Sequence, residues 1–362
     1  VEQVQGIDSN FEANIDSDHE TCRTYSDDPR IIQADYRHGQ APDASYFFYF
    51  PHKPVGDASI VFLDHLRNIQ KISRWDLWKN PVPSQDVTPL YALELSSDKG
   101  MAMVARRKIQ VGELIASERP LVVSRTNPAI AEDQNKSGIF YRAALSGLSA
   151  AARKSVLSLR NSFGPEREPI LGILLTNCLP VTIPGAPETQ YSGLFPVLCR
   201  ANHDCSPNAN FFFNTRSFTG QLHAVHSIAE NEEITVLYSE LAAPRKERQA
   251  ELLEHYKFLC ECRTCSLPLA QAEESDARRR AIGEMIPLMH RGVYADDLTV
   301  ARIEELLAWA QEEGLHALYS QLLVYGYGLA TKLGLQDISR TWSRMAANAY
   351  KILNGADFLR FN

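Results

Sequence analysis

The chain has 362 residues, of which 44% are hydrophobic and 22% are charged. This length exceeds what one hydrophobic core usually supports, so we expect two or three packed units of an ordinary globular protein. No apolar run approaches the roughly 20 residues that cross a bilayer. A net charge of -7 without a long Lys/Arg stripe also argues against direct nucleic-acid binding.

The first 28 residues account for the whole charge imbalance, with eight acidic residues and one arginine. Such a segment is typical of a solvated terminus, and an acidic arm that meets a basic partner is the alternative. Residues 1–88 have no clean periodicity, but the aromatic run at 46–50 predicts at least one short strand or helix docked on the main domain. Because the chain begins with Val1, a removed targeting peptide would leave no trace in it.

Short strands and turns are predicted along residues 90–123, where β-prone runs alternate with the turn signals SSDKG and QVGE. Residues 128–176 have apolar positions at helical spacing, which predicts helices. Strands are predicted again over residues 222–228 and 232–238.

Beyond Pro268 the pattern predicts successive helices. Gly314, Gly334 and Gly355 each end a periodic segment, at the position where a helix terminus favours positive φ. These helices resemble helical-hairpin repeats, and a plain packing domain is the alternative.

Seven cysteines, three of them in the segment FLCECRTC, indicate metal binding in a reducing compartment rather than a disulfide framework. The three are Cys260, Cys262 and Cys265. They can occupy three vertices of the tetrahedron that Zn²⁺ favours, and water or a distant residue would occupy the fourth. Cys205 is the strongest candidate for the fourth ligand, with His203 and Cys199 as alternatives.

Four motifs resemble the SET domain of protein lysine methyltransferases and its zinc-binding post-SET tail. They are KGMAMVARRKIQVGELIASERPLVV (99–123), NHDCSPN (202–208), NEEITVLYSE (231–240) and YKFLCECRTC (256–265). Four motifs in the family's order are far more specific than any single one. The chain is most similar to fungal and animal proteins of the SET–MYND subgroup, but the insertion between the motifs has no cysteine apart from Cys178, so the MYND finger is absent from it.

The resemblance implies methyl transfer from S-adenosylmethionine to a lysine side chain of a protein, histone or non-histone. It makes Tyr238 and Tyr256 the catalytic residues, the first beside the transferring methyl group and the second in the wall of the lysine channel. A phenol can donate or accept a hydrogen bond while its ring lines a channel, although a tyrosine at a strand end is also commonly a packing residue. The implied cofactor residues are Lys99, Gly100, Met101, Asn177, Asn202, His203, Tyr238 and Phe258.

Asn177 and the turn that begins at Gly100 each differ from a simple match to the family. Asn177 is explained equally well as a residue that caps a helix end. The family's Gly-x-Gly turn has Ala102 in place of the second glycine, which adds a Cβ where the backbone approaches the cofactor.

We therefore expect an α+β fold, namely a β-rich SET domain of short strands over residues 89–240 with a helical insertion at about 126–190. An N-terminal region (1–88), a post-SET tail (241–268) and a C-terminal helical domain (269–362) complete the expected organisation. The expected cofactors are S-adenosylmethionine and structural Zn²⁺, in a monomer located in the cytoplasm and/or nucleus. A SET fold that binds without turnover and a SET fold that acts on a small molecule are the alternatives.

Overall fold

The computed structural model describes residues 22–25, 28–34, 45–50, 60–72, 82–83, 89–96, 99–125, 141–183, 190–240 and 242–355. The chain divides into two compact units. The first comprises residues 1–84, 117–199 and 213–220, and the second comprises residues 85–116, 200–212 and 221–362. Most of the acidic N-terminal segment lies outside the described residues.

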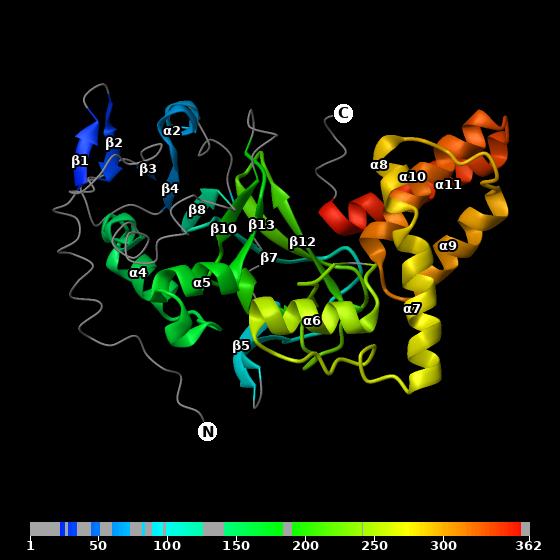
Figure 1. Cartoon of the computed structure of the whole chain (residues 1–362), viewed down its shortest axis with the longest axis horizontal. Coiled ribbons are helices and arrows are strands. Elements are labelled where there is room, and N and C mark those ends of the chain that lie inside the picture. The colour runs from blue at the N-terminus through cyan, green and yellow to red at the C-terminus, as the bar shows by residue number, and fades with distance from the viewer. Residues whose placement is uncertain are drawn as a thin grey trace. The chain divides into compact units, whose positions relative to one another are not determined.

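A seven-stranded sheet forms the framework of the first unit (Figure 1). Its strands, in spatial order, are β1 (Cys22–Tyr25), β2 (Asp28–Ala34), β3 (Ser45–Phe50), β4 (Ile60–His65), β8 (Val122–Arg125), β10 (Tyr191–Leu194) and β9 (Cys178–Val181). Neighbours are antiparallel except β4 and β8, which are parallel. The short helix α2 (Leu66–Ile72) follows β4. The expectation of ordered elements within residues 1–88 is therefore confirmed.

Helices pack on this sheet. They are residues 141–146, α4 (Ala150–Leu157) and α5 (Pro169–Asn177), with a 3₁₀ turn, η3 (Gly164–Glu166), before α5. The helical pattern predicted for 128–176 is confirmed where the structure describes it. The hydroxyl of Tyr49 donates to the carbonyls of Ala143 and Ala144, at 3.1 and 3.0 Å. Gly147 is required here because a Cβ on it would lie 2.2 Å from the Tyr49 ring.

The other strands are short. β5 (Tyr91–Ser96) and β6 (Gly100–Ala105) form an antiparallel pair. β12 (Ala209–Asn214), β13 (Thr219–Ala224) and β7 (Leu114–Glu118) form a three-stranded sheet in that order. β11 (Asn202–His203) runs parallel to β14 (Thr235–Val236), and the 3₁₀ turn η4 (Leu198–Arg200) precedes β11.

Among the described residues, six α-helices complete the second unit. They are α6 (Arg245–Tyr256), α7 (Leu269–Gly283), α8 (Ile286–Arg291), α9 (Val300–Glu312), α10 (His316–Lys332) and α11 (Gln336–Asn354) (Figure 1). The predicted helix ends are confirmed, since Gly314, Gly334 and Gly355 have φ of 69°, 74° and 83°. Helix α6 is absent from the sequence prediction.

The C-terminal helices have a core of their own, which includes Ile303, Leu322 and Trp342. The amide of Asn210 in β12 donates to the carbonyl of Leu353 at 3.0 Å, so the end of α11 lies against the strands of the same unit. The predicted α+β class is confirmed, whereas the predicted domain boundaries stay a prediction. Within the described residues, no helix is both long and apolar enough to span a bilayer.

Candidate active site and metal centre

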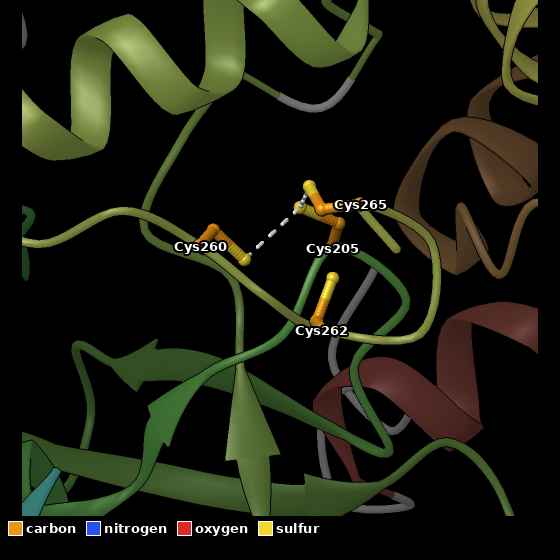
Figure 2. A group of neighbouring side chains, drawn as sticks. All are labelled: Cys205, Cys260, Cys262 and Cys265. Atoms are coloured by element: carbon orange, nitrogen blue, oxygen red, sulfur yellow. Dashed lines mark hydrogen bonds between the residues drawn. The ribbon is translucent and has the colours of Figure 1, made fainter. Parts of the chain in front are cut away.

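The four predicted metal ligands converge on one point. The sulfur atoms of Cys205, Cys260, Cys262 and Cys265 all lie within 4.8 Å of one another, and the side chains face a common centre (Figure 2). The Cys205 sulfur is 4.0 Å from that of Cys260 and 3.5 Å from that of Cys265. A tetrahedral site with Zn–S bonds of about 2.3 Å has sulfur atoms about 3.8 Å apart. The donor set and its spacing therefore fit Zn²⁺, with protein sulfur at every vertex.

Two segments supply these ligands. Cys205 lies in the turn after β11, and the other three lie in the loop that follows α6. Lys257 ends α6 in the left-handed conformation, with φ of 59°, and so turns the chain into this loop. The Gln249 amide of α6 then donates to the Cys260 carbonyl at 2.9 Å. Neither alternative fourth ligand, His203 or Cys199, belongs to the cluster.

His203 supports the cluster without being a member of it. Its Nδ1 accepts a hydrogen bond from the backbone N–H of Tyr238 at 2.9 Å. The ring proton must therefore sit on Nε2, which lies 3.2 Å from the sulfur of Cys205 and donates to it. Burial lowers the pKa of His203 to about 4, so the ring is neutral at physiological pH.

The predicted aromatic residues gather beside the cysteines. The centroid of the Tyr238 ring is 4.8 Å from the centroid of the Tyr256 ring and 5.5 Å from that of the His203 ring. The ring centroids of Phe258 and His203 are 6.3 Å apart. The Tyr238 hydroxyl donates to the carbonyl of Ala201 at 2.7 Å. This arrangement places a phenol oxygen and a backbone carbonyl next to aromatic faces.

A carboxylate that the sequence analysis missed organises the polar side of the site. One carboxylate oxygen of Glu233 pairs with the ammonium group of Lys99, and the other accepts a hydrogen bond from the amide nitrogen of Asn202, each at 2.8 Å. The same amide nitrogen lies 3.4 Å from the carbonyl of Met101. Both contacts use the amide nitrogen, so Oδ1 is the Asn202 atom left to accept from a ligand. The second glutamate of NEEIT is the sequence signal that could have identified Glu233.

The structure places both Gly100 and Ala102 of the Gly-Met-Ala motif in strand β6. The positive φ, 79°, belongs to Gly100, and a Cβ there would meet no described atom within 4 Å. This open space beside the backbone fits the close approach of a ligand. Ala102 lies further along β6, opposite Glu94, and is buried. Its Cβ therefore occupies an ordinary strand position.

Asn177 lies in the first unit, at the end of α5. Its amide nitrogen donates to the carbonyls of Arg160 and Ile173, both at 2.7 Å. These contacts are those of a residue that secures a helix end, and its role at a cofactor stays a prediction.

Comparison with known proteins covers part of this site. The family model of the SET domain matches residues 100–239. The chain is 33% identical to histone-lysine N-methyltransferase set5 of Schizosaccharomyces pombe over 196 residues, which are 54% of this chain and 56% of that protein. It is 40% identical over 77 residues to histone-lysine N-methyltransferase ASHR1 of Arabidopsis thaliana, which are 21% of this chain and 16% of that protein.

A third relative is histone-lysine N-methyltransferase SMYD3 of Homo sapiens, 34% identical over 85 residues, which are 24% of this chain and 18% of that protein. The chain therefore spans little more than half of the first relative and less than a fifth of the other two.

Proposed function

We propose that the chain transfers a methyl group from S-adenosylmethionine to a lysine side chain of a protein. The premise is that residues 100–239 form a SET domain. The observation that carries the proposal is the packing of Tyr238, Tyr256 and Phe258 around the cysteine cluster, while the adjacent strand pair β11–β14 holds Asn202, whose amide donates to Glu233. The names of the three relatives, all histone-lysine N-methyltransferases, agree with it.

The lysine side of the reaction requires a neutral amine at the attacking nitrogen. A lysine titrates near pKa 10.4 in water, and burial against apolar surface favours its uncharged form. The Tyr238 and Tyr256 rings supply that surface, and the Tyr238 hydroxyl and the Ala201 carbonyl supply the polar atoms that orient the amine. Alignment of this kind lowers a barrier by several kcal/mol without any acid or base.

The cofactor site is assigned to the polar contacts among Lys99, Asn202 and Glu233. S-adenosylmethionine supplies an electrophilic methyl group on a sulfonium centre. Oδ1 of Asn202 accepts a hydrogen bond from the ammonium group in the methionine part of S-adenosylmethionine, because the amide nitrogen of Asn202 already donates to Glu233. Open space at Gly100 receives the ligand against the backbone, and Phe258 offers a flat apolar face for the adenine ring.

The proposal includes one structural Zn²⁺ on the four cysteines. Its role is to hold the tail that carries Tyr256 and Phe258 against strand β11, which carries Asn202, and the segment after β14, which carries Tyr238. We expect about one zinc per chain, and a loss of stoichiometric zinc in Cys260→Ser. Cys178→Ser is the control, since Cys178 lies outside the cluster. Unchanged zinc in Cys260→Ser would contradict the site.

The activity is tested in two steps. Calorimetry with S-adenosylmethionine is expected to show one site per chain, and methyl transfer is then measured on a peptide library that includes histone tails. No binding at any concentration would contradict the proposal. Binding without transfer would indicate a non-catalytic binding module, and transfer to small molecules alone would indicate the other alternative.

A further inference from the structure

Two arginines are completely buried around the cysteine cluster, and neither has a place in the chemistry described above. Arg248 on α6 and Arg279 on α7 each have 0% of their surface exposed. A guanidinium group does not lose its proton in proteins, and burying its charge is unfavourable unless an anion or several acceptors surround it. The partners of these two side chains therefore show what the burial achieves.

Arg248 is paired with the ligand sulfurs. Its Nε lies 3.2 Å from the sulfur of Cys205, and one terminal nitrogen lies 3.8 Å from the sulfur of Cys265. The other terminal nitrogen donates to the Ala243 carbonyl at 2.5 Å. Within the described part of the chain, these are its hydrogen-bond partners, so the negative charge that offsets Arg248 comes from the thiolates. Four thiolates on one Zn²⁺ have a formal charge of about -2, which a buried cation partly neutralises.

Arg279 connects the backbone of a ligand residue to the C-terminal helices. One of its terminal nitrogens donates to the Cys205 carbonyl at 3.0 Å and to the Glu313 carbonyl at 3.1 Å. Its Nε donates to the Glu313 carboxylate at 2.9 Å. Glu313 follows the last residue of α9, and its side chain is only 4% exposed.

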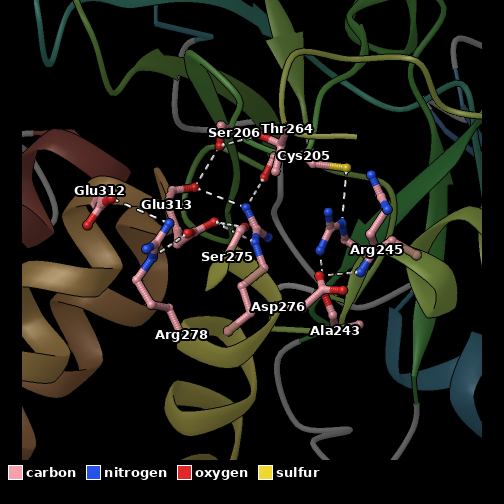
Figure 3. Close-up of polar contacts among 12 residues, drawn as sticks. Cys205, Ser206, Ala243, Arg245, Thr264, Ser275, Asp276, Arg278, Glu312 and Glu313 are labelled. Atoms are coloured by element: carbon pink, nitrogen blue, oxygen red, sulfur yellow. Dashed lines mark hydrogen bonds and ion pairs between the residues drawn. The ribbon is translucent and has the colours of Figure 1, made fainter. Parts of the chain in front are cut away.

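The residues around Glu313 close this connection (Figure 3). The hydroxyl of Ser206, directly after Cys205, donates to the Glu313 carbonyl at 2.6 Å. Ser275 and Arg278 of α7 donate to its two carboxylate oxygens, at 2.6 and 2.8 Å. The turn that presents Cys205 is thus held from two helices that belong to the C-terminal helical core.

From these contacts we propose that Arg248, Arg279 and Glu313 form a buried supporting shell that sets the metal affinity of the cysteine site. Metal binding and the packing of α7 and α9 are then thermodynamically linked, and the linkage acts in both directions. The proposal rests on the zinc site of the proposed function and is independent of methyl transfer.

The first test replaces Glu313 by glutamine, which keeps the size of the side chain and removes its charge. Its control is Glu312→Gln, the same change one residue earlier, where the side chain is 60% exposed and pairs only with Arg278 among the described residues. Zinc affinity is measured by competition with a chromophoric chelator. We expect about tenfold weaker binding in Glu313→Gln, within the range typical of such supporting partners, and no change in Glu312→Gln.

The second test is specific to the sulfur atoms. Arg248→Lys keeps the charge but loses the planar fork that reaches two sulfurs and a carbonyl. Arg263→Lys is the control, because Arg263 is exposed between Cys262 and Cys265. With Co²⁺ in the site, we expect the sulfur-to-metal charge-transfer band to move to lower energy in Arg248→Lys and to stay in place in Arg263→Lys. A general loss of stability would not move this band.

The outcomes separate the claims. If the wild-type chain holds zinc but Glu313→Gln matches Glu312→Gln in affinity, or the cobalt band of Arg248→Lys is unshifted, the supporting shell is wrong. A wild-type chain without zinc overturns the shell together with the metal part of the proposed function. Affinity and band changes in a chain that transfers no methyl group support the shell and count against the enzyme alone.

Discussion

Two adjacent residues, Asn202 and His203, serve two different sites. In a strand, successive side chains point to opposite faces. Asn202 in β11 faces Met101 and Glu233, whereas His203 faces the sulfur of Cys205. The dipeptide therefore ties the proposed cofactor site to the metal site through the strand geometry alone.

Glu233 fixes which end of the Asn202 amide faces a ligand, so it acts as a positioning residue. We expect Glu233→Gln to weaken S-adenosylmethionine binding about tenfold, because a glutamine can present an N–H where the carboxylate accepts, which lets the Asn202 amide turn over. Glu230→Gln, an exposed position three residues earlier, is the matched control. Equal affinities of the two variants in calorimetry would show that Glu233 has no such role.

Tyr238 is the residue on which the proposed chemistry depends most. Tyr238→Phe removes the hydroxyl that donates to Ala201 and leaves the ring in place. We expect methyl transfer to fall by about 100-fold or more, which is the usual effect of removing one oriented polar group from an active site. The change in unfolding free energy should be only about 1 kcal/mol. Turnover at the wild-type rate would remove Tyr238 from the active site.

At the scale of elements, strand β7 secures the turn that leads into the site. The carboxylate of Glu118 in β7 accepts from the backbone N–H groups of Val197 and Leu198, at 2.9 and 3.2 Å, where η4 begins. Burial raises the pKa of Glu118 to about 7, against the effect of these two hydrogen bonds. The start of η4 is therefore held by a group that titrates near neutral pH.

This pKa predicts how stability changes with pH. The native carboxyl keeps its proton to a higher pH than an unfolded glutamate does, so the native state binds the extra proton between about pH 4.5 and 7 and loses stability as the pH rises through that window. The loss is up to about 3 kcal/mol and is absent from Glu118→Gln. Urea unfolding of both proteins across this range measures it, and parallel curves would refute the prediction.

The turn after α9 offers a matched comparison with the turn after α10. Gly314 and Gly334 both have positive φ, but a Cβ on Gly314 would lie 3.0 Å from the Cβ of Ser206, whereas one on Gly334 would meet no described atom within 4 Å. Each alanine variant should lose about 1 kcal/mol from the backbone conformation. We expect Gly314→Ala to lose about 1 kcal/mol more through overpacking. Equal losses in thermal unfolding would mean that the Ser206 turn adjusts freely.

At the scale of the whole molecule, the chain has separate cores that depend on the metal to different degrees. The core of the first unit contains residues such as Val61, Leu148 and Leu194, and no residue of the cysteine cluster. The cluster has its own small core around Leu252, with Tyr238, Tyr256 and Phe258 packed against it. The metal should therefore control order locally rather than throughout the chain.

Chelation of zinc tests this expectation. We expect hydrogen exchange to increase in α6 and in residues 257–268, because they lose the four-sulfur crosslink that holds them. Exchange in α5 and β10 should stay within about twofold of that in the zinc-loaded protein. Exchange that rises equally in both regions would show that the metal stabilises the chain as one cooperative unit.

The sequence was sufficient for features that depend on local spacing. The C-x-C-x-x-C cysteines, the NHDCSPN turn and the glycines that end α9, α10 and α11 could all be identified because ligand spacing and positive φ are local requirements. The α+β class followed from the resemblance of four ordered motifs to the SET domain. Helix α6 was missed, although the residues from Arg245 onward are good helix formers.

Only the tertiary structure could reveal the rest, because burial and pairing depend on segments that are distant in the chain. Glu233 meets Lys99 across 134 residues, and Ser206 meets Glu313 across 107. A charged residue in a helix is normally solvated, so nothing local marks Arg248 as fully buried against sulfur. Likewise, β4 of the N-terminal region joins the sheet through β8, a partner that its own pattern of apolar residues does not specify.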